Sequence, residues 1–194
     1  MTSDQRRAVL ILRDPKIIRL LADLTRSEIL RFLSEKPMTE KQLSEELGLT
    51  KAAVGYHLRL LREAGLIEID RVEAEEHGIL QKYYVAVAAL FIVDPDYIPN
   101  DARRYFLEMQ IEHLRGMLSV FKLFDRISEV SSEGLERLAE AMLRQLRIVG
   151  ERHVKEKIGD RDPETLRVKI YAEALANLTK EREWNNLFRK LNGY

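Results

Sequence analysis

The chain has 194 residues, of which 45% are apolar and 33% charged, and it contains no cysteine. This length allows one large domain or two small ones, and the apolar content excludes a disordered chain. Without cysteine, neither disulfides nor thiolate metal sites can form. The 32 basic residues balance the 32 acidic ones, so any affinity for a polyanion must come from local placement of charge.

No segment has the features of a signal peptide or a membrane span. The apolar run Ala8–Leu12 is too short for a secretory signal. The longest uncharged apolar run, Tyr83–Val93, is well short of the roughly 20 residues that cross a bilayer. These features predict a cytoplasmic protein without membrane contact. The abundance of Glu, Arg and Lys also resembles the composition of thermophilic, archaeal-type proteins.

Residues that commonly begin or end helices predict two short helices near the start of the chain. Asp14-Pro15 opens the first, because proline is favoured in the first helical turn. Thr25 is the expected N-cap of the second, which Lys36-Pro37 ends.

Two further helices follow with clear capping signals. Thr39 is expected to form a capping box with Gln42, and Gly48 to end this third helix in a left-handed turn. Thr50 is the expected N-cap of the fourth, Lys51 to Ala64.

The segments 66–73 and 79–87 then read as two strands joined by a turn at 75–78. A short helix, a glycine turn, a longer helix and a hairpin follow one another in the order of a winged helix-turn-helix. We therefore predict a mainly α fold with a small β-hairpin wing.

The fourth predicted helix has two different sides. Val54, Leu58 and Leu61 recur at helical spacing and predict a buried stripe. The opposite side is small and cationic, and no acidic residue occurs between Leu49 and Arg62. A mid-helix glycine costs about 1 kcal/mol relative to alanine, so Gly55 on the exposed side suggests close approach to another surface.

This side suits the major groove of DNA. Arg59 is suited to a bidentate pair with guanine, Tyr56 to a base or phosphate, and Lys51 to a phosphate. The alternative is that these cations form an ordinary solvated face. The predicted DNA-binding residues are Thr50, Lys51, Ala52, Gly55, Tyr56, His57, Arg59 and Arg62 on the helix, and Arg71, Gln81 and Lys82 on the wing strands.

Residues 14–87 resemble the ArsR-type family of winged-helix repressors. The resemblance rests on these segments: Ala22–Arg26, Ile29-Leu30, Leu33, Gln42-Leu43, Leu47–Leu49, Val54, His57-Leu58, Leu61, Ala64–Ile67 and Tyr83-Tyr84. It implies a homodimeric DNA-binding repressor, often one that releases DNA when a metal or another signal arrives.

Three features depart from the family pattern. Position 55 is glycine where the family commonly has serine, and the cysteine pair of its thiolate metal sensors is missing. The wing tip carries Glu73, Glu75 and Glu76, which phosphates would repel. Deep insertion of the wing tip into the minor groove is therefore not expected.

The second half predicts three long helices, at roughly 101–129, 132–158 and 163–191, after a linker at 94–100. We thus expect a DNA-binding domain at 1–93 and a helical domain at 101–194. The first long helix carries two apolar seams, one from Phe106 to Ile127 and one from Leu107 to Phe121, so a partner chain is expected to cover it. Two alternatives stay open, a buttress within one chain and an effector pocket lined by Phe121, Phe124, Tyr171 and Trp184.

The sequence therefore predicts a homodimeric, sequence-specific regulator of transcription, a repressor, with double-stranded DNA and an unknown small-molecule effector as partners. No nucleophile–base pair, phosphate loop or metal-ligand cluster stands out, so we expect no enzyme activity, no cofactor and no metal site. His57 is expected to support packing or touch a phosphate, and His77 lies at the wing tip. His113 and His153 lie on different predicted long helices and lack a close ligand pair, and the alternative is a metal site assembled across a dimer. The alternative is a winged module that contacts proteins and does not bind DNA.

Overall fold

The computed structural model describes residues 6–74, 80–123, 127, 130–159, 161–184 and 187–188. Its residues cluster into two compact units that alternate along the chain. The first comprises Met1–Leu10, Leu20–Phe91 and His153–Arg167, and the second comprises Ile11–Arg19, Ile92–Arg152 and Val168–Tyr194. The predicted linker at 94–100 lies within the second unit. The domain boundaries at 93 and 101 stay a prediction.

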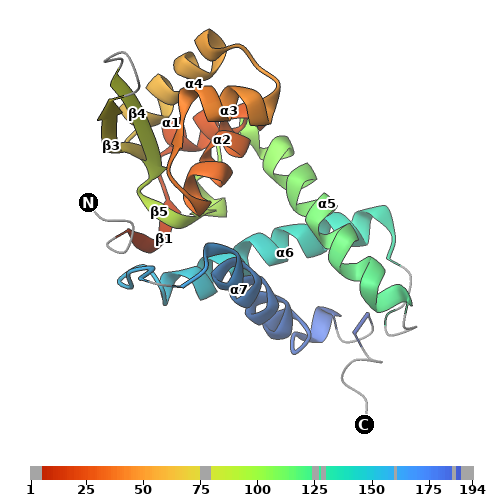
Figure 1. Ribbon diagram of the computed structural model, residues 1–194. Helices are drawn as coiled ribbons and strands as arrows, with labels where there is room; N and C mark the ends of the chain where they lie inside the picture. Colours follow the sequence, from red (N-terminus) through yellow and green to blue (C-terminus); the bar gives the residue numbers. More distant parts are fainter. Residues whose placement is uncertain are drawn as a thin grey trace. The chain divides into compact units, whose positions relative to one another are not determined.

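The first two helices form where proline and aspartate begin them (Figure 1). Helix α1 spans Pro15–Leu21, and Asp14 accepts a hydrogen bond from the backbone N of Lys16 at 2.8 Å. Helix α2 spans Leu24–Glu35, and its N-cap is Asp23, which accepts from the backbone N of Arg26 at 2.9 Å. The prediction of Thr25 as this cap is wrong, because the carboxylate two residues earlier already satisfies the free amide.

The next two helices form a helix-turn-helix with the predicted caps. Helix α3 spans Glu40–Leu47, and the capping box between Thr39 and Gln42 is confirmed. Gly48 has a φ of 64°, the left-handed conformation expected of the turn residue. Helix α4 spans Lys51–Glu63, and the hydroxyl of Thr50 caps it by accepting from the backbone N of Ala53 at 3.2 Å.

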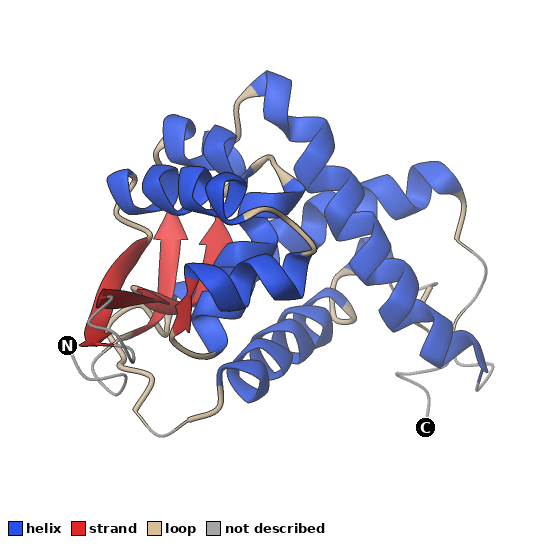
Figure 2. Cartoon of the chain, turned by 45° about the horizontal axis from the view of Figure 1, so that its top comes forward, coloured by secondary structure: helices blue, strands red, loops and turns tan. Residues whose placement is uncertain are grey.

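All the strands described lie in the first half of the chain, red in Figure 2. One antiparallel sheet has the order β2-β4-β3 and contains β2 (Met38–Thr39), β3 (Ile67–Ala74) and β4 (Leu80–Ala86). The β3–β4 hairpin is the predicted wing, and its register runs from Ile67 opposite Ala86 to Ala74 opposite Leu80. The turn predicted at 75–78 lies outside the described residues. The predicted fold, mainly α with a small wing, is confirmed.

Two strands were not predicted. Strand β1 spans Arg7–Leu12, strand β5 spans Ala88–Val93, and they pair with each other. Both are continuous apolar runs, and a short run of this kind lacks the alternation that distinguishes a strand from a buried helix.

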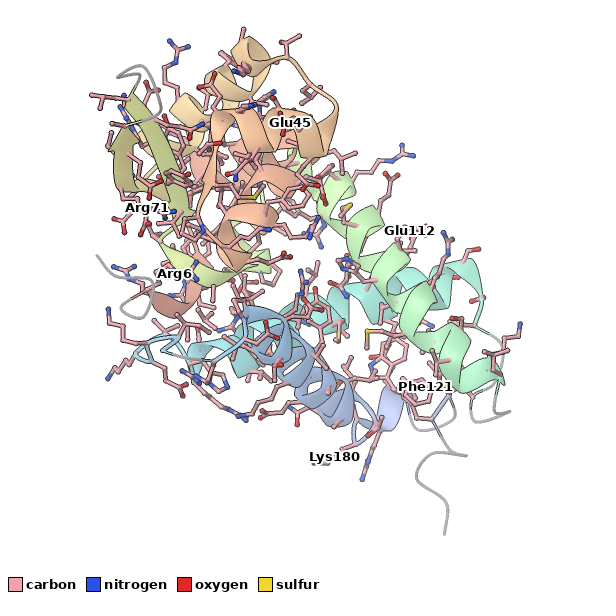
Figure 3. All side chains as sticks on the ribbon, in the orientation of Figure 1. Arg6, Glu45, Arg71, Glu112, Phe121 and Lys180 are labelled. Carbon is pink, nitrogen blue, oxygen red and sulfur yellow. The ribbon has the colours of Figure 1, made fainter. Side chains whose placement is uncertain are left out.

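The first unit packs its core between α2, α3, α4 and the sheet. The side chains of Ile29, Leu33, Leu43 and Leu58 in this core are all at most 2% exposed. Arg6, labelled in Figure 3, is also buried, and its guanidinium donates to the carbonyl of Ser34 at 3.0 Å. Burial lowers the pKa of this guanidinium.

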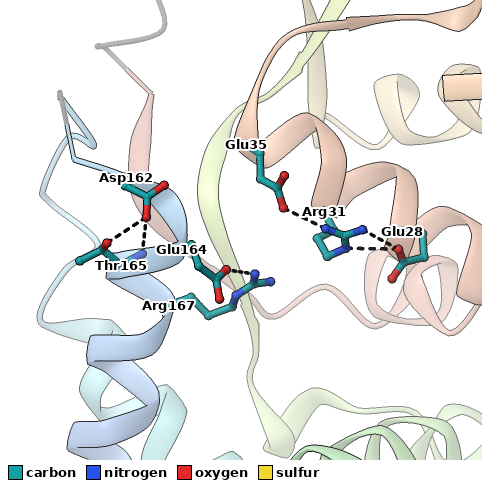
Figure 4. Close-up of polar contacts among 7 residues, drawn as sticks. All are labelled: Glu28, Arg31, Glu35, Asp162, Glu164, Thr165 and Arg167. Atoms are coloured by element: carbon teal, nitrogen blue, oxygen red, sulfur yellow. Dashed lines mark hydrogen bonds and ion pairs between the residues drawn. The ribbon is translucent and has the colours of Figure 1, made fainter. Parts of the chain in front are cut away.

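Charged side chains of the same unit form local ion pairs and a helix cap. Arg31 on α2 pairs with Glu28 at 3.0 Å and with Glu35 at 2.9 Å (Figure 4). Asp162 accepts from the backbone N of Thr165 at 2.8 Å and so caps the start of α7 (Pro163–Leu178), which begins at the predicted residue 163 (Figure 4).

The second unit contains the remaining long helices. Helix α5 spans Asn100–Leu123 and packs against α6, which spans Ser132–Glu151. Short 3-10 helices occur at Pro95–Tyr97 and Arg182–Trp184. The buried carboxylate of Asp94 accepts from Arg13 at 2.9 Å, so the predicted linker begins with a fixed ion pair.

Two long helices end earlier than predicted. Helix α6 stops at Glu151 rather than at residue 158, because the segment that follows pairs with the start of the chain within the first unit. There the backbone N of Ala8 donates to the carbonyl of Glu156 at 2.9 Å, and the backbone N of Ile158 donates to that of Arg6 at 2.9 Å. Helix α7 stops at Leu178 rather than at residue 191. Residues 124–126 and 128–129, where the first long helix was predicted to end, lie outside the description.

The two predicted seams of α5 differ in burial. The second seam supplies Leu114 and Leu118, which are buried with Ala102 and Gln110. In the first seam Val120 is 52% exposed, and beyond it Leu123 is 83% exposed. Among the described helices, none combines the length and the apolar character that crossing a membrane requires.

Candidate nucleic-acid interface

Helix α4 buries one side and exposes the other, as its sequence pattern predicts. Val54, Leu58 and Leu61 are at most 2% exposed and hold the helix against the core. The opposite side, which we call the reading face, consists of Ala52, Gly55, Tyr56 and Arg59. Three of these four residues are exposed, and Gly55 is partly covered.

The cations of α4 form no ion pairs within the described part of the chain. Lys51, Arg59 and Arg62 are exposed, and none of them forms an ion pair with another described residue. The guanidinium of Arg59 lies 5.6 Å from the centroid of the Tyr56 ring. These charges are therefore available to an anionic partner.

His57 is only partly exposed. Its ring lies 5.5 Å from that of Tyr56 in an edge-to-face arrangement. Its Nδ1 is buried and has no hydrogen-bond partner among the described atoms. The histidine thus packs beside Tyr56 of the reading face.

The arginine of the wing is engaged by its own strand. Arg71 donates to Glu73 at 2.6 Å and to Asp70 at 2.8 Å, and its guanidinium lies 3.8 Å from the centroid of the Tyr83 ring. These contacts raise the pKa of Arg71, and the hydrogen bond from Arg71 is the main cause of the lowered pKa of Glu73. Lys82 on the neighbouring strand is exposed and forms no ion pair with a described residue.

A groove of about 420 Å³ lies beside the reading face, between the starts of α3 and α4 and strand β4. We call it the lysine groove, since three of its walls carry a lysine. It is lined by Thr39, Glu40, Lys41, Lys51, Leu80, Gln81, Lys82 and Tyr84. The structure thus brings together three predicted residues, Lys51, Gln81 and Lys82. It adds Glu40 and Lys41, which sequence reasoning missed.

Glu40 changes the expected character of the reading face. A Cβ atom built on Gly55 meets the carboxyl group of Glu40 at 3.2 to 3.3 Å. The acid-free stretch from Leu49 to Arg62 therefore faces a carboxylate that α3 contributes. The signal for this contact is Gly55 itself, a small residue on an otherwise exposed helix side.

The carboxylate of Glu40 also affects the pKa of Tyr84, which lies on β4. Burial is the main cause of the raised pKa of Tyr84, and the negative charge of Glu40 raises it further, while Arg62 acts in the opposite direction. The groove therefore combines a positive rim with one negative group inside it.

Metal chemistry has no support in the described residues. No group of three or more His, Asp or Glu side chains in this part of the chain is arranged to hold a metal ion. His153 is buried, and its Nδ1 lies 3.0 Å from the carboxylate of Glu156. His77 lies outside the described residues.

The helix-turn-helix also matches known regulators. Residues 23–68 match the family model described as "Bacterial regulatory protein, arsR family". The chain is 36% identical over 56 residues to the HTH-type transcriptional regulator KmtR of Mycobacterium tuberculosis. The matched segment covers 29% of this chain and 43% of KmtR. The chain thus spans less than half the length of this relative. The predicted resemblance is confirmed over 23–68, which is narrower than 14–87.

Solved structures give a weaker likeness. ZitR of Lactococcus lactis, a mutant in apo form, has a TM-score of 0.31 and 18% identity, covering 64% of this chain and 83% of ZitR. NMB1585, a MarR family regulator from Neisseria meningitidis, has a TM-score of 0.32 and 19% identity, covering 73% of this chain and 86% of that protein.

Proposed function

We propose, starting from the ArsR-family helix-turn-helix at residues 23–68, that this chain is a transcriptional regulator that binds double-stranded DNA. The proposal rests on one observation, that α4 has a buried apolar side and an exposed cationic side. This helix is fixed by its leucine side and offers cations without an ion-pair partner among the described residues on the other. A helix of this kind fits the major groove, which is about 12 Å wide.

The proposed contacts fall into two classes. Ala52, Gly55, Tyr56 and Arg59 approach base edges, where Arg59 is suited to guanine. The phosphate contacts come from Thr50, Lys51, His57, Arg62, Gln81 and Lys82, and from Arg71 once it is released from Glu73. Of these residues, Lys51, Gln81 and Lys82 line the lysine groove.

Salt dependence of duplex binding tests this function. Binding of the full chain to a random duplex should weaken as salt rises, because each phosphate contact releases a counterion. Lys51→Ala should reduce the slope of log K against log salt by about one. Duplex binding that is absent, or that does not depend on salt, would instead support a module that contacts proteins.

We further propose that the chain acts as a homodimeric repressor on a palindromic operator. The apolar side chains of Val120 and Leu123 on α5 are exposed, and a second copy of the chain is a natural cover for them. Two recognition helices in one dimer would read half-sites about 34 Å apart. An operator is first selected from a pool of random duplexes by binding to the full chain. A reporter gene downstream of this operator should lose expression when the chain is present, whereas increased expression would indicate an activator.

A small-molecule effector is the least supported part of this proposal. A cavity of about 70 Å³ in the second unit is lined by residues of α5 and α6 and the segment before α5. Ligand pockets usually measure about 300 Å³ or more. Support for an effector would come from a compound that changes duplex affinity.

A further inference from the structure

The carboxylate of Glu40 is held in place by two independent features of the fold. Glu40 is the first residue of α3, and the capping box of Thr39 and Gln42 fixes this end of the helix. The residues just before it, Met38 and Thr39, pair with β4 in the three-stranded sheet. The backbone that carries Glu40 is therefore anchored by both a helix cap and a sheet.

The side chain of Glu40 reaches the reading face of α4. Its carboxyl group lies 3.2 to 3.3 Å from the position that a Cβ atom on Gly55 would take. Real Cβ atoms rarely come this close, so a side chain at position 55 would require the carboxylate to shift by a few tenths of an ångström. Gly55 thus leaves room for Glu40 in its present position beside this face.

The charge of Glu40 is not neutralised within the described part of the protein. Lys41, Lys51 and Lys82 line the same groove, yet none of them forms an ion pair with Glu40. Glu40 thus supplies hydrogen-bond acceptors to an open groove of about 420 Å³ that three lysines also line.

A carboxylate in this position has a narrow choice of partners in a duplex. It accepts hydrogen bonds and donates none, so it repels phosphates and the O6 and N7 acceptors of guanine. The donors in the major groove are the amino groups of cytosine and adenine. In adenine the N7 acceptor lies beside the amino group and opposes a carboxylate, whereas cytosine offers its N4 amino group beside a carbon-bound hydrogen.

We propose that Glu40 is a specificity-determining residue that accepts a hydrogen bond from the N4 amino group of a cytosine. This inference rests on the proposed function, because it needs α4 in the major groove. The lysines around the groove supply affinity for phosphates of any sequence. Glu40 lowers the affinity for every duplex and lowers it least where cytosine is present, so it contributes discrimination.

The experiment compares two variants that each remove one negative charge from α3. Glu40→Gln keeps the size of the side chain, and Glu45→Gln is the matched control. Glu45, labelled in Figure 3, is exposed and is not among the residues that line the lysine groove. Full-length proteins are used to select duplexes from a pool with a randomised centre. Affinities are then measured for the selected duplex and for its three base variants at each position tested.

The wild-type protein should prefer cytosine at one position of the half-site by roughly fivefold or more. Glu40→Gln should reduce this preference to less than twofold, and Glu45→Gln should keep it. Gly55→Ala, which requires the carboxylate to shift by a few tenths of an ångström, should also reduce the preference at that position, by less than Glu40→Gln does. Thermal melting confirms that each variant is folded.

Two results would overturn the inference, and they can be told apart. If Glu40→Gln and Glu45→Gln raise the affinity for all duplexes alike and leave the base preference unchanged, Glu40 reads no base, although DNA binding stands. If the wild-type chain binds no duplex in a salt-dependent way, the proposed function fails and the role of Glu40 fails with it.

Discussion

Arg59 is placed to test base reading at the level of one side chain. It is exposed on the reading face, and its guanidinium contacts the Tyr56 ring rather than a carboxylate. We expect Arg59→Ala to lower the affinity for the selected duplex by 1–3 kcal/mol, about 5- to 150-fold, because a bidentate pair with guanine is lost. Duplex titration of the full chain measures this change, and the melting temperature should not change.

The control for this prediction is another exposed arginine. Arg104 on α5 is exposed and pairs with Glu108, far from α4 in the sequence. Arg104→Ala should leave the duplex affinity unchanged. Equal losses in the two variants would mean that Arg59 acts only through the overall charge.

Glu73 is one of two acidic residues that hold the guanidinium of Arg71. Its carboxylate accepts from Arg71 at 2.6 Å, and Asp70 holds the same guanidinium at 2.8 Å. Glu73→Gln weakens this hold and removes a negative charge from the wing. We expect the affinity for a random duplex to rise and the slope against log salt to steepen by up to about one, as for one added phosphate contact.

A double substitution separates the release of Arg71 from the loss of charge. In an Arg71→Ala background, Glu73→Gln should still raise affinity slightly but should leave the salt slope unchanged. An equal steepening in both backgrounds would show that the wing arginine makes no phosphate contact.

At the level of elements, the capping box connects fold stability to the interface. Thr39 is 1% exposed, its hydroxyl accepts from the backbone N of Gln42 at 3.2 Å, and the segment it begins carries Glu40 and Lys41. Thr39→Ala should lower the free energy of unfolding by about 1 kcal/mol, because one free amide of α3 loses its partner. Chemical denaturation monitored by circular dichroism measures it.

The conservative variant Thr39→Ser keeps the hydroxyl and should retain most of this stability. If Thr39→Ser destabilises the protein as much as Thr39→Ala does, the methyl group in the core matters more than the cap.

Local signals predicted the helix-turn-helix well and contacts between elements poorly. The caps at Thr39 and Thr50 and the turn at Gly48 each depend on a few neighbouring residues, so the sequence sufficed for them. The same reasoning named Thr25 instead of Asp23, since both residue types cap helices equally well.

Long-range pairing explains the larger errors. Strands β1 and β5 were missed because they pair with each other across about eighty residues of chain. An apolar run alone does not indicate which segment it pairs with. The predicted helix at 132–158 ended early because Glu156 and Ile158 pair with the start of the chain. Glu40 was missed at the interface for the same reason, since eleven positions separate it from α4 in the sequence.

For the whole molecule, zero net charge and DNA binding are compatible because charge is distributed unevenly. Many arginines are paired locally, as Arg31 is with Glu28 and Glu35 on α2. Lys51, Arg59 and Arg62 on α4 have no such partners among the described residues, whereas Arg71 on the wing is paired with Asp70 and Glu73. A neutral chain can therefore present a positive surface at one place, and its long-range attraction to DNA should be weak.

Self-association of the full chain is the last consequence that we can test. Leu123 at the end of α5 is 83% exposed and Val120, one turn earlier, is 52% exposed, an arrangement that favours burial against a second copy. Light scattering should therefore report twice the chain mass of 22.7 kDa. Leu123→Asp should shift the population towards monomer and weaken binding to the palindromic duplex more than to one half-site, because a monomer cannot contact both half-sites at once.

Leu24→Asp is the matched control for this experiment. Leu24 is also an exposed leucine, at 62%, but it lies in the first turn of α2, where an acidic residue is well tolerated. This variant should stay dimeric and bind both duplexes as the wild type does. A wild-type chain that scatters as a monomer would remove the dimer from the proposal. If Leu123→Asp stays fully dimeric, the interface must lie elsewhere, and the exposed end of α5 would then need another explanation.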